Sequence, residues 1–110
     1  RAPGRTLRLD VRVSSSVLCE KQSYDMAAVR VRIMDEYGTT ASYAQLPVEL
    51  RAEGCIALAG ADRVTAEGGM CGAYVRSMGC AGRGTLRLRA PGTDEVKIDF
   101  TVEIGEGEHV

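Results

Sequence analysis

Apolar and polar residues alternate with a period of two along most of this 110-residue chain. Successive side chains of a β-strand point to opposite faces, so each alternating run builds one apolar face and one polar face. Runs of this kind are typical of antiparallel sheets that pack against each other through their apolar faces. The clearest runs span residues 6–13, 29–33, 46–52, 86–89 and 96–103, and shorter runs at 56–59, 63–66 and 70–77 predict the remaining strands.

Turn-forming residues separate these runs, and no window of helical length carries an apolar stripe with a period of 3.6 residues. Seven to eight short antiparallel strands without a helix predict an all-β fold, an immunoglobulin-like β-sandwich. We expect the sandwich domain to span residues 6–104, after a linker at 1–5 and before a tail at 105–110.

The last hairpin allows a prediction of strand register. Pairing Leu88 with Ile98 keeps both side chains in the core and places Arg87 opposite Asp99, an opposite-charge pair across the strands. A shift of either strand by one residue would turn Asp99 or Lys97 towards the core. We therefore predict the Leu88–Ile98 register.

The bulk composition limits the possible functions. A chain of this length with 45% hydrophobic residues makes one globular domain with a modest core. The formal net charge of −1 gives no basic surface for nucleic acid, and no apolar run approaches the roughly 20 residues that span a bilayer. Neither nucleic acid nor a membrane is expected as a partner. No apolar segment typical of a signal peptide follows residues 1–5, which indicate a piece of a longer chain.

The cysteines show no metal-binding pattern. The chain holds Cys19, Cys55, Cys71 and Cys80, and one histidine, His109, in the expected tail. A zinc site needs about four closely placed ligands, so no metal is predicted. The antibody arrangement of two cysteines around a buried tryptophan is also missing, because the chain has no Trp. We expect free thiols, which favour a reducing, cytoplasmic compartment, and Cys71–Cys80 is the first pair to test for a disulfide.

No group of residues in the sequence predicts catalysis or a cofactor. The acidic pairs at 35–36 and 94–95 resemble the two carboxylates of a glycosidase, but both pairs lie in turns, where aspartate is favoured for bonding its own backbone. The serine cluster at 14–16 has no histidine partner. The glycine-rich stretch 68–72 lacks the lysine and the helix of a phosphate loop, so a tight turn into a strand explains it better. Gly72, in mid-strand, indicates a close approach of two backbones.

Arginines and tyrosines are the surface residues that suggest contacts. The arginines on polar faces either form a docking surface for a neighbouring domain or an acidic ligand, or only solvate the sheets and block edge pairing. Tyr37 and Tyr43 flank one loop and either form a weak platform for a sugar ring or pack within the loop. We take Tyr37, Tyr43, Arg30 and Arg32 as candidate sugar or docking contacts. The outward arginines are Arg8, Arg12, Arg30, Arg32, Arg51, Arg87 and Arg89.

A succession of motifs runs from about residue 7 to residue 102. Its strongest part is Gly-Gly-Met-Cys-Gly-Ala-Tyr-Val-Arg at 68–76, and other parts are Tyr24-Asp25, 28–32, 35–38, 43–44, 47–48, Gly54 and 79–82. This succession resembles the C-terminal immunoglobulin-like domain of bacterial glycoside hydrolase family 2 enzymes, the β-galactosidase group. A strand ending in Asp-x-x-Gly and a later Gly-x-Tyr-Val strand also resemble intimin/invasin-type repeats, which implies an intimin/invasin-like variant of the sandwich.

In family 2 enzymes the catalytic glutamates belong to a separate TIM barrel, whose motifs this chain lacks. The resemblance therefore implies a non-catalytic accessory domain, without catalytic residues or cofactor, that packs against other domains of the same polypeptide. Such a domain would buttress the active-site region or support oligomer contacts. The alternatives are a cell-surface adhesin repeat and a carbohydrate-binding module, for which carbohydrate would be the partner.

Overall fold

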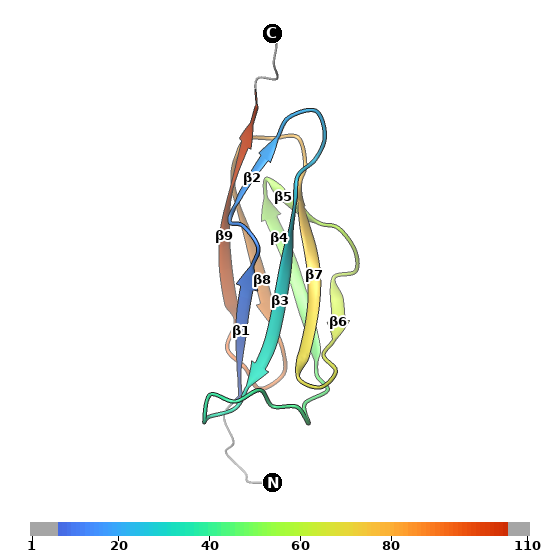
Figure 1. The fold of residues 1–110 in the computed structure, drawn as a ribbon, viewed down its shortest axis with the longest axis vertical. Coiled ribbons are helices and arrows are strands. Elements are labelled where there is room, and N and C mark those ends of the chain that lie inside the picture. Colours follow the sequence, from blue (N-terminus) through green and yellow to red (C-terminus); the bar gives the residue numbers. More distant parts are fainter. Residues whose placement is uncertain (1–6, 106–110) are drawn as a thin grey trace.

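The computed structural model describes residues 7–105, which form β-strands and no helix (Figure 1). No stretch within these residues is a helix long and apolar enough to cross a bilayer. The linker at 1–5 and all but the first residue of the tail at 105–110 lie outside the described residues. The strands are β1 (Arg8–Val13), β2 (Val17–Glu20), β3 (Met26–Met34), β4 (Pro47–Gly54), β5 (Ile56–Leu58), β6 (Arg63–Thr65), β7 (Met70–Ser77), β8 (Gly82–Arg89) and β9 (Val96–Ile104).

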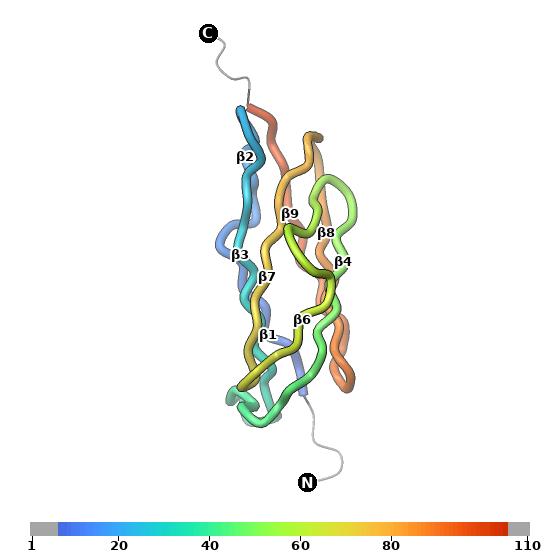
Figure 2. Tube along the Cα trace, turned by 90° about the vertical axis from the view of Figure 1, so that its right-hand side faces the viewer, coloured from blue at the N-terminus to red at the C-terminus, as the bar shows by residue number. Residues whose placement is uncertain are grey.

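Two sheets pack face to face, which confirms the predicted immunoglobulin-like sandwich. Sheet A has the strand order β1-β3-β7-β5, and sheet B has the order β2-β9-β8-β4-β6. Figure 2 shows β3 and β7 on one side of the molecule and β4 and β8 on the other. Most apolar side chains of the strands point into the space between the sheets, as the alternation predicts, while Met26, Met70 and Tyr74 are exposed. The largest buried side chains of this core include Phe100, Leu18, Ile33, Leu86 and Leu88, each at most 1% exposed.

The sequence analysis predicted seven to eight antiparallel strands and missed the short strand β2. With β2 the described residues form nine strands, and one pair of them is parallel. Strand β2 has four residues and pairs in parallel with β9. The chain leaves sheet A after β1 and enters sheet B through the serine cluster at 14–16. Ser14 Oγ accepts the backbone N–H of Ala28 at 3.0 Å, and Thr101 donates its backbone N–H to the Ser16 carbonyl at 2.9 Å. These bonds therefore stabilise the segment that crosses from sheet A to sheet B between β1 and β2.

The predicted Leu88–Ile98 pairing is wrong by two residues. Leu88 lies opposite Val96, which leaves Arg87 opposite Lys97 instead of the predicted carboxylate. A shift of two residues keeps every side chain on its own face, so the alternation cannot distinguish the two registers. The charge argument failed because the carboxylates near Arg87 are Glu53 on the neighbouring strand β4 and Glu95, which precedes β9, and not Asp99.

The expectation of free thiols holds for only two of the four cysteines. Cys55 and Cys80 form a disulfide with their Cα atoms 5.6 Å apart, while Cys19 and Cys71 are free. The spacing in the sequence hides this pair, because it forms where the β4–β5 crossover meets the β7–β8 loop at one end of the sandwich. The predicted Cys71–Cys80 pairing is wrong, since about 20 Å of extended β7 separates Cys71 from the end of that strand. Because two of the four cysteines are bonded to each other, the cysteines no longer favour a reducing compartment.

Candidate docking faces

The predicted arginine surface is divided between the two outer faces of the sandwich. Alternate residues of each sheet face away from the shared core, so outward residues of sheet A and of sheet B point in opposite directions. The arginines therefore make two separate surfaces. Arg8, Arg12, Arg30 and Arg32 lie on sheet A, and Arg51, Arg87 and Arg89 lie on sheet B.

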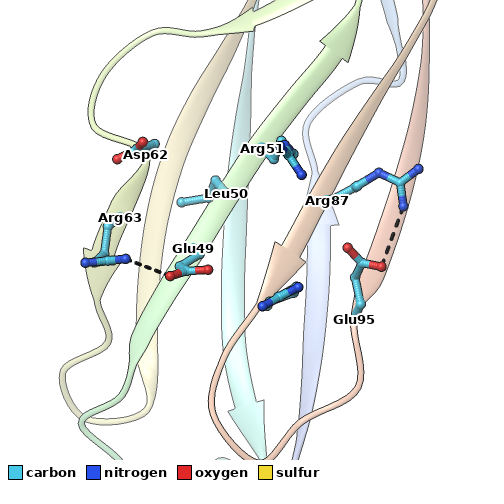
Figure 3. Close-up of a pocket in the computed structure, with 8 residues that line it drawn as sticks. Glu49, Leu50, Arg51, Asp62, Arg63, Arg87 and Glu95 are labelled. Carbon is cyan, nitrogen blue, oxygen red and sulfur yellow. Dashed lines mark hydrogen bonds and ion pairs between the residues drawn. The ribbon is translucent and has the colours of Figure 1, made fainter.

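A row of three cations crosses the outer face of sheet B. Arg51 on β4 lies opposite Arg87 on β8, which lies opposite Lys97 on β9. Like charges directly opposite each other destabilise a sheet unless carboxylates offset them. Arg87 has two such carboxylates, because its Nε donates to Glu53 at 3.1 Å and its Nη1 lies 3.6 Å from Glu95. Figure 3 shows the second of these contacts. The hydrogen bond from Arg87 to Glu53 and the charge of that carboxylate raise the pKa of Arg87.

A shallow groove on the same face runs between β4, β6 and β8. Arg63 on β6 donates to Glu49 on β4 at 2.7 Å, as Figure 3 shows. No ion pair joins Arg51 or Arg89 to another residue between 7 and 105. Acidic and basic side chains nearly balance in this groove, which is typical of a solvated sheet face rather than of a site for ligands of one charge.

The outer face of sheet A carries the candidate contacts Arg30 and Arg32. Arg32 donates to Asp10 at 3.2 Å, and Arg12 lies 3.6 Å from the same carboxylate. Arg30 lies between Arg12 and Gly72 in the sheet, is exposed, and has no ion pair with any residue that the structure describes. One carboxylate thus serves two arginines, and a third arginine remains unpaired beside them.

A groove interrupts the outer face of sheet A where two neighbouring strands carry small residues. Ala28 on β3 and Gly72 on β7 form its floor, and Met70 and Tyr74 stand on either side of Gly72 along β7. A Cβ at Gly72 would lie 3.2 Å from the carbonyl oxygen of Val29, which confirms the predicted close approach of two backbones. The sequence analysis treated Gly72 only as a packing feature, and the neighbouring Ala28 that completes the groove becomes apparent only from the pairing of β3 with β7.

The predicted tyrosine platform lies elsewhere. Tyr37 and Tyr43 belong to the loop between β3 and β4, at the end of the sandwich where β1 begins (Figure 1), and both rings are exposed. Arg30 and Arg32 lie within β3. The four candidate contacts therefore come from two places, a loop and a sheet face, and a sugar contact at the tyrosines stays a prediction.

The acidic pairs take part in turns and ion pairs. Asp35 Oδ1 accepts the backbone N–H groups of Tyr37 at 2.9 Å and Thr39 at 3.0 Å, which closes the turn after β3. In the second pair, Glu95 lies beside Arg87. Within residues 7–105, no cluster of three or more His, Cys, Asp or Glu side chains is arranged to hold a metal ion.

Asp25 joins three strands, a role for which the sequence offered no signal beyond the Tyr24-Asp25 motif. Its carboxylate accepts the backbone N–H of Cys19 at 2.9 Å. Its own N–H donates to the hydroxyl of the fully buried Ser77 at 3.0 Å, and the backbone N–H of Ser77 donates to the Asp25 carbonyl at 2.9 Å. Asp25 therefore ties β2, β3 and β7 together near one end of the sandwich.

The two free cysteines differ in exposure, which predicts a difference in reactivity. Cys19 is exposed on β2, whereas Cys71 is half-buried, and burial raises the pKa of its thiol. Because the thiolate is the reacting form, we expect iodoacetamide at pH 8 to alkylate Cys19 about tenfold faster than Cys71 in the folded chain. Mass spectrometry of peptides taken over time measures the two rates. Equal rates in the folded chain, or a difference that survives in urea, would contradict this assignment.

The chain matches no family model and no curated protein. Solved structures do share its fold. A glycosyl hydrolase family 2 member from Bacteroides cellulosilyticus superposes on 87% of this chain with a TM-score of 0.81 and 16% identity. A β-glycosidase from Bacteroides vulgatus superposes on 86% with a TM-score of 0.79 and 18% identity. A β-glucuronidase from Parabacteroides merdae superposes on 84% with a TM-score of 0.67 and 17% identity.

Each of these matches involves a small part of a larger enzyme. The chain spans 14%, 14% and 12% of the three enzymes in the order given. Domains 4 and 5 of the S-layer protein SbsC also match, with a TM-score of 0.57 and 17% identity over 86% of this chain and 51% of that one. Likeness at these identities is a likeness of fold. It confirms the resemblance drawn from the motifs, because a domain-sized part of family 2 glycoside hydrolases has this sandwich.

Proposed function

We propose that this chain is a non-catalytic accessory domain of a multidomain glycoside hydrolase of family 2, similar to the β-galactosidases. The observation that carries the proposal is the coverage of the matches. Most of this chain superposes on glycosidases, yet it accounts for only 12–14% of their length. A domain of that size leaves the catalytic site to the rest of the enzyme and packs against the domains that form it.

The placement of the carboxylates supports a non-catalytic role. Glycosidases place two carboxyl groups about 5–10 Å apart on either side of the scissile bond. Asp35 closes a turn, and Asp10, Glu49 and Glu53 pair with arginines on open sheet faces.

The purified 110-residue chain is expected to release no nitrophenol from p-nitrophenyl β-galactoside or β-glucuronide above the buffer rate. The product of the complete gene is expected to hydrolyse one of these glycosides, because its barrel would supply the two catalytic carboxylates. Absorbance at the nitrophenolate band measures both reactions. Hydrolysis that co-purifies with the isolated chain would refute the non-catalytic role, and a complete gene without a barrel would refute the proposed parent.

A second candidate is a cell-surface adhesin repeat or a carbohydrate-binding module. The shared fold with an S-layer protein favours the first, and the exposed rings of Tyr37 and Tyr43 in one loop favour the second. A tandem array of similar sandwiches in the complete gene would support the adhesin. Binding of galacto-oligosaccharides to the isolated chain, with loss of that binding in the Tyr37→Ala variant, would support the module.

A further inference from the structure

Large apolar side chains gather on the outer face of sheet A. Met26, Met70 and Tyr74 point outward from β3 and β7, and each is more than half exposed. Arg76 lies opposite Met26, and its guanidinium sits 4.5 Å from the ring centroid of Tyr24, which extends the apolar surface beyond the start of β3. The middle of the outer face of sheet B carries charged and threonine side chains instead.

The composition of this sheet A face is that of a protein interface. Tyrosine, methionine and arginine are enriched where proteins meet, and lysine, glutamate and aspartate are depleted there. Aromatic and arginine side chains also carry much of the binding energy of such contacts. The two outer faces therefore differ in composition, since both carry ion pairs but only sheet A also presents exposed methionine and tyrosine side chains from its strands.

The shape and the charge of the face define its partner. The floor of Ala28 and Gly72 leaves a recess beside Tyr74 that an apolar side chain would fill. Arg30 and Glu67 both line the recess, and Arg30 has no ion pair with a described residue. Over the whole outer face of β1, β3 and β7, arginines outnumber acids. Carboxylates on the partner would therefore complement the arginines of this face. The outward charged residues of β1, β3 and β7 are Arg8, Asp10, Arg12, Arg30, Arg32 and Arg76.

We infer that the outer face of sheet A is the surface that docks against a neighbouring domain of the same polypeptide, which places an apolar side chain over Gly72 and carboxylates beside Arg30. This inference rests on the proposed accessory role. A second copy of the chain would fit poorly, because its own arginines would meet these arginines. The strands of sheet A have 6, 9, 8 and 3 residues. At about 3.3 Å per residue and about 4.8 Å between strands they present about 400 Å², so the two partners together bury about 800 Å², within the range of contacts between domains of one chain.

The methionines and the tyrosine on the face make oxidative footprinting the direct experiment. Hydroxyl radicals oxidise exposed methionine and tyrosine side chains, and peptide mass spectrometry reads each site. We expect Met26, Met70 and Tyr74 to be oxidised at least about fivefold more slowly in the complete gene product than in the isolated chain. Tyr37, which is 83% exposed in the β3–β4 loop, is the internal control and should label equally in both. Circular dichroism checks that the isolated chain is folded.

Two variants of the complete protein test the stated chemistry. Tyr74→Asp and Arg30→Glu should each restore the labelling of Met70 to the rate in the isolated chain, because one removes an apolar anchor and the other reverses the complementary charge. Equal labelling of the face in both forms, in a protein that has a barrel, would overturn this inference and leave the accessory role intact. A complete gene without other domains would overturn both. If neither variant changed the labelling of Met70, the inferred apolar side chain over Gly72 and the carboxylates beside Arg30 would be refuted.

Discussion

Replacement of Gly54 by alanine is expected to lower the free energy of unfolding by about 2–5 kcal/mol. Gly54 ends β4 with a φ of +81°, in the left-handed region that costs other L-residues about 1–2 kcal/mol. A Cβ there would also overlap the carbonyl oxygen of Arg83 and lie 3.0 Å from the Cα of Gly84. These are backbone atoms that cannot rotate away, and overpacking of this kind costs about 1–3 kcal/mol more.

Gly38 offers a matched control for this variant. Its φ is +80°, but apart from its two neighbours in the chain no residue has an atom within 4 Å of the position of a Cβ. Gly38→Ala should therefore cost only the conformational penalty of about 1–2 kcal/mol. Urea denaturation followed by circular dichroism, with the disulfide intact, gives both values. The difference between the two variants is the cost of the close backbone contact at Gly54. Equal losses would mean that the chain can relax at this crossover.

Loss of the Cys55–Cys80 disulfide is the second large effect. The double variant Cys55→Ser, Cys80→Ser should lower the free energy of unfolding by about 3 kcal/mol, because the bond closes a loop of 25 residues in the unfolded chain. Since small domains are stable by only about 5–15 kcal/mol, this is a large share of the total. Thermal unfolding should show a melting temperature lower by more than 10 °C or so.

Three measurements separate the disulfide from other effects of the substitutions. Dithiothreitol should destabilise the native chain to about the level of the double variant and leave that variant unchanged. Cys19→Ser, which removes an exposed free thiol, should change stability by less than about 0.5 kcal/mol. Peptide mapping without reductant should recover Cys55 and Cys80 in one linked peptide. Four titratable thiols in the native, unreduced protein would refute the bond.

Alternation along the strands is a local signal, and it predicts what local signals can. It placed the major strands and assigned their inner and outer faces, because each residue needs only its two neighbours to define a face. It could not choose between Ile98 and Val96 as the partner of Leu88, since both lie on the inner face. The charge of Arg87 could not choose either, because Arg87 bonds to Glu53 on a third strand, which a hairpin considered alone does not include.

The features that define the candidate docking face depend on contacts between distant segments. Ala28 and Gly72 are separated by more than forty positions, and the recess exists only because β3 and β7 pair in one register. Cys55 and Cys80 meet because two loops reach the same end of the sandwich. The candidates Arg30 and Arg32 could be named from the sequence as outward arginines. Their neighbours Tyr74 and Met70 could be grouped with them only after the sheet was assembled.

The parallel pairing of β2 with β9 has a mechanical consequence. Figures 1 and 2 show β1 beginning at one end of the sandwich and β9 finishing at the other. Tension between neighbouring parts of a longer chain would therefore pull β2 and β9 in opposite directions along the strands, across the hydrogen bonds that join them. Bonds loaded in shear must break together, whereas those of a hairpin pulled from its open end break one at a time. The pairing of the four residues of β2 with β9 would thus resist stretching, and the sandwich would transmit force along its length before it unfolds.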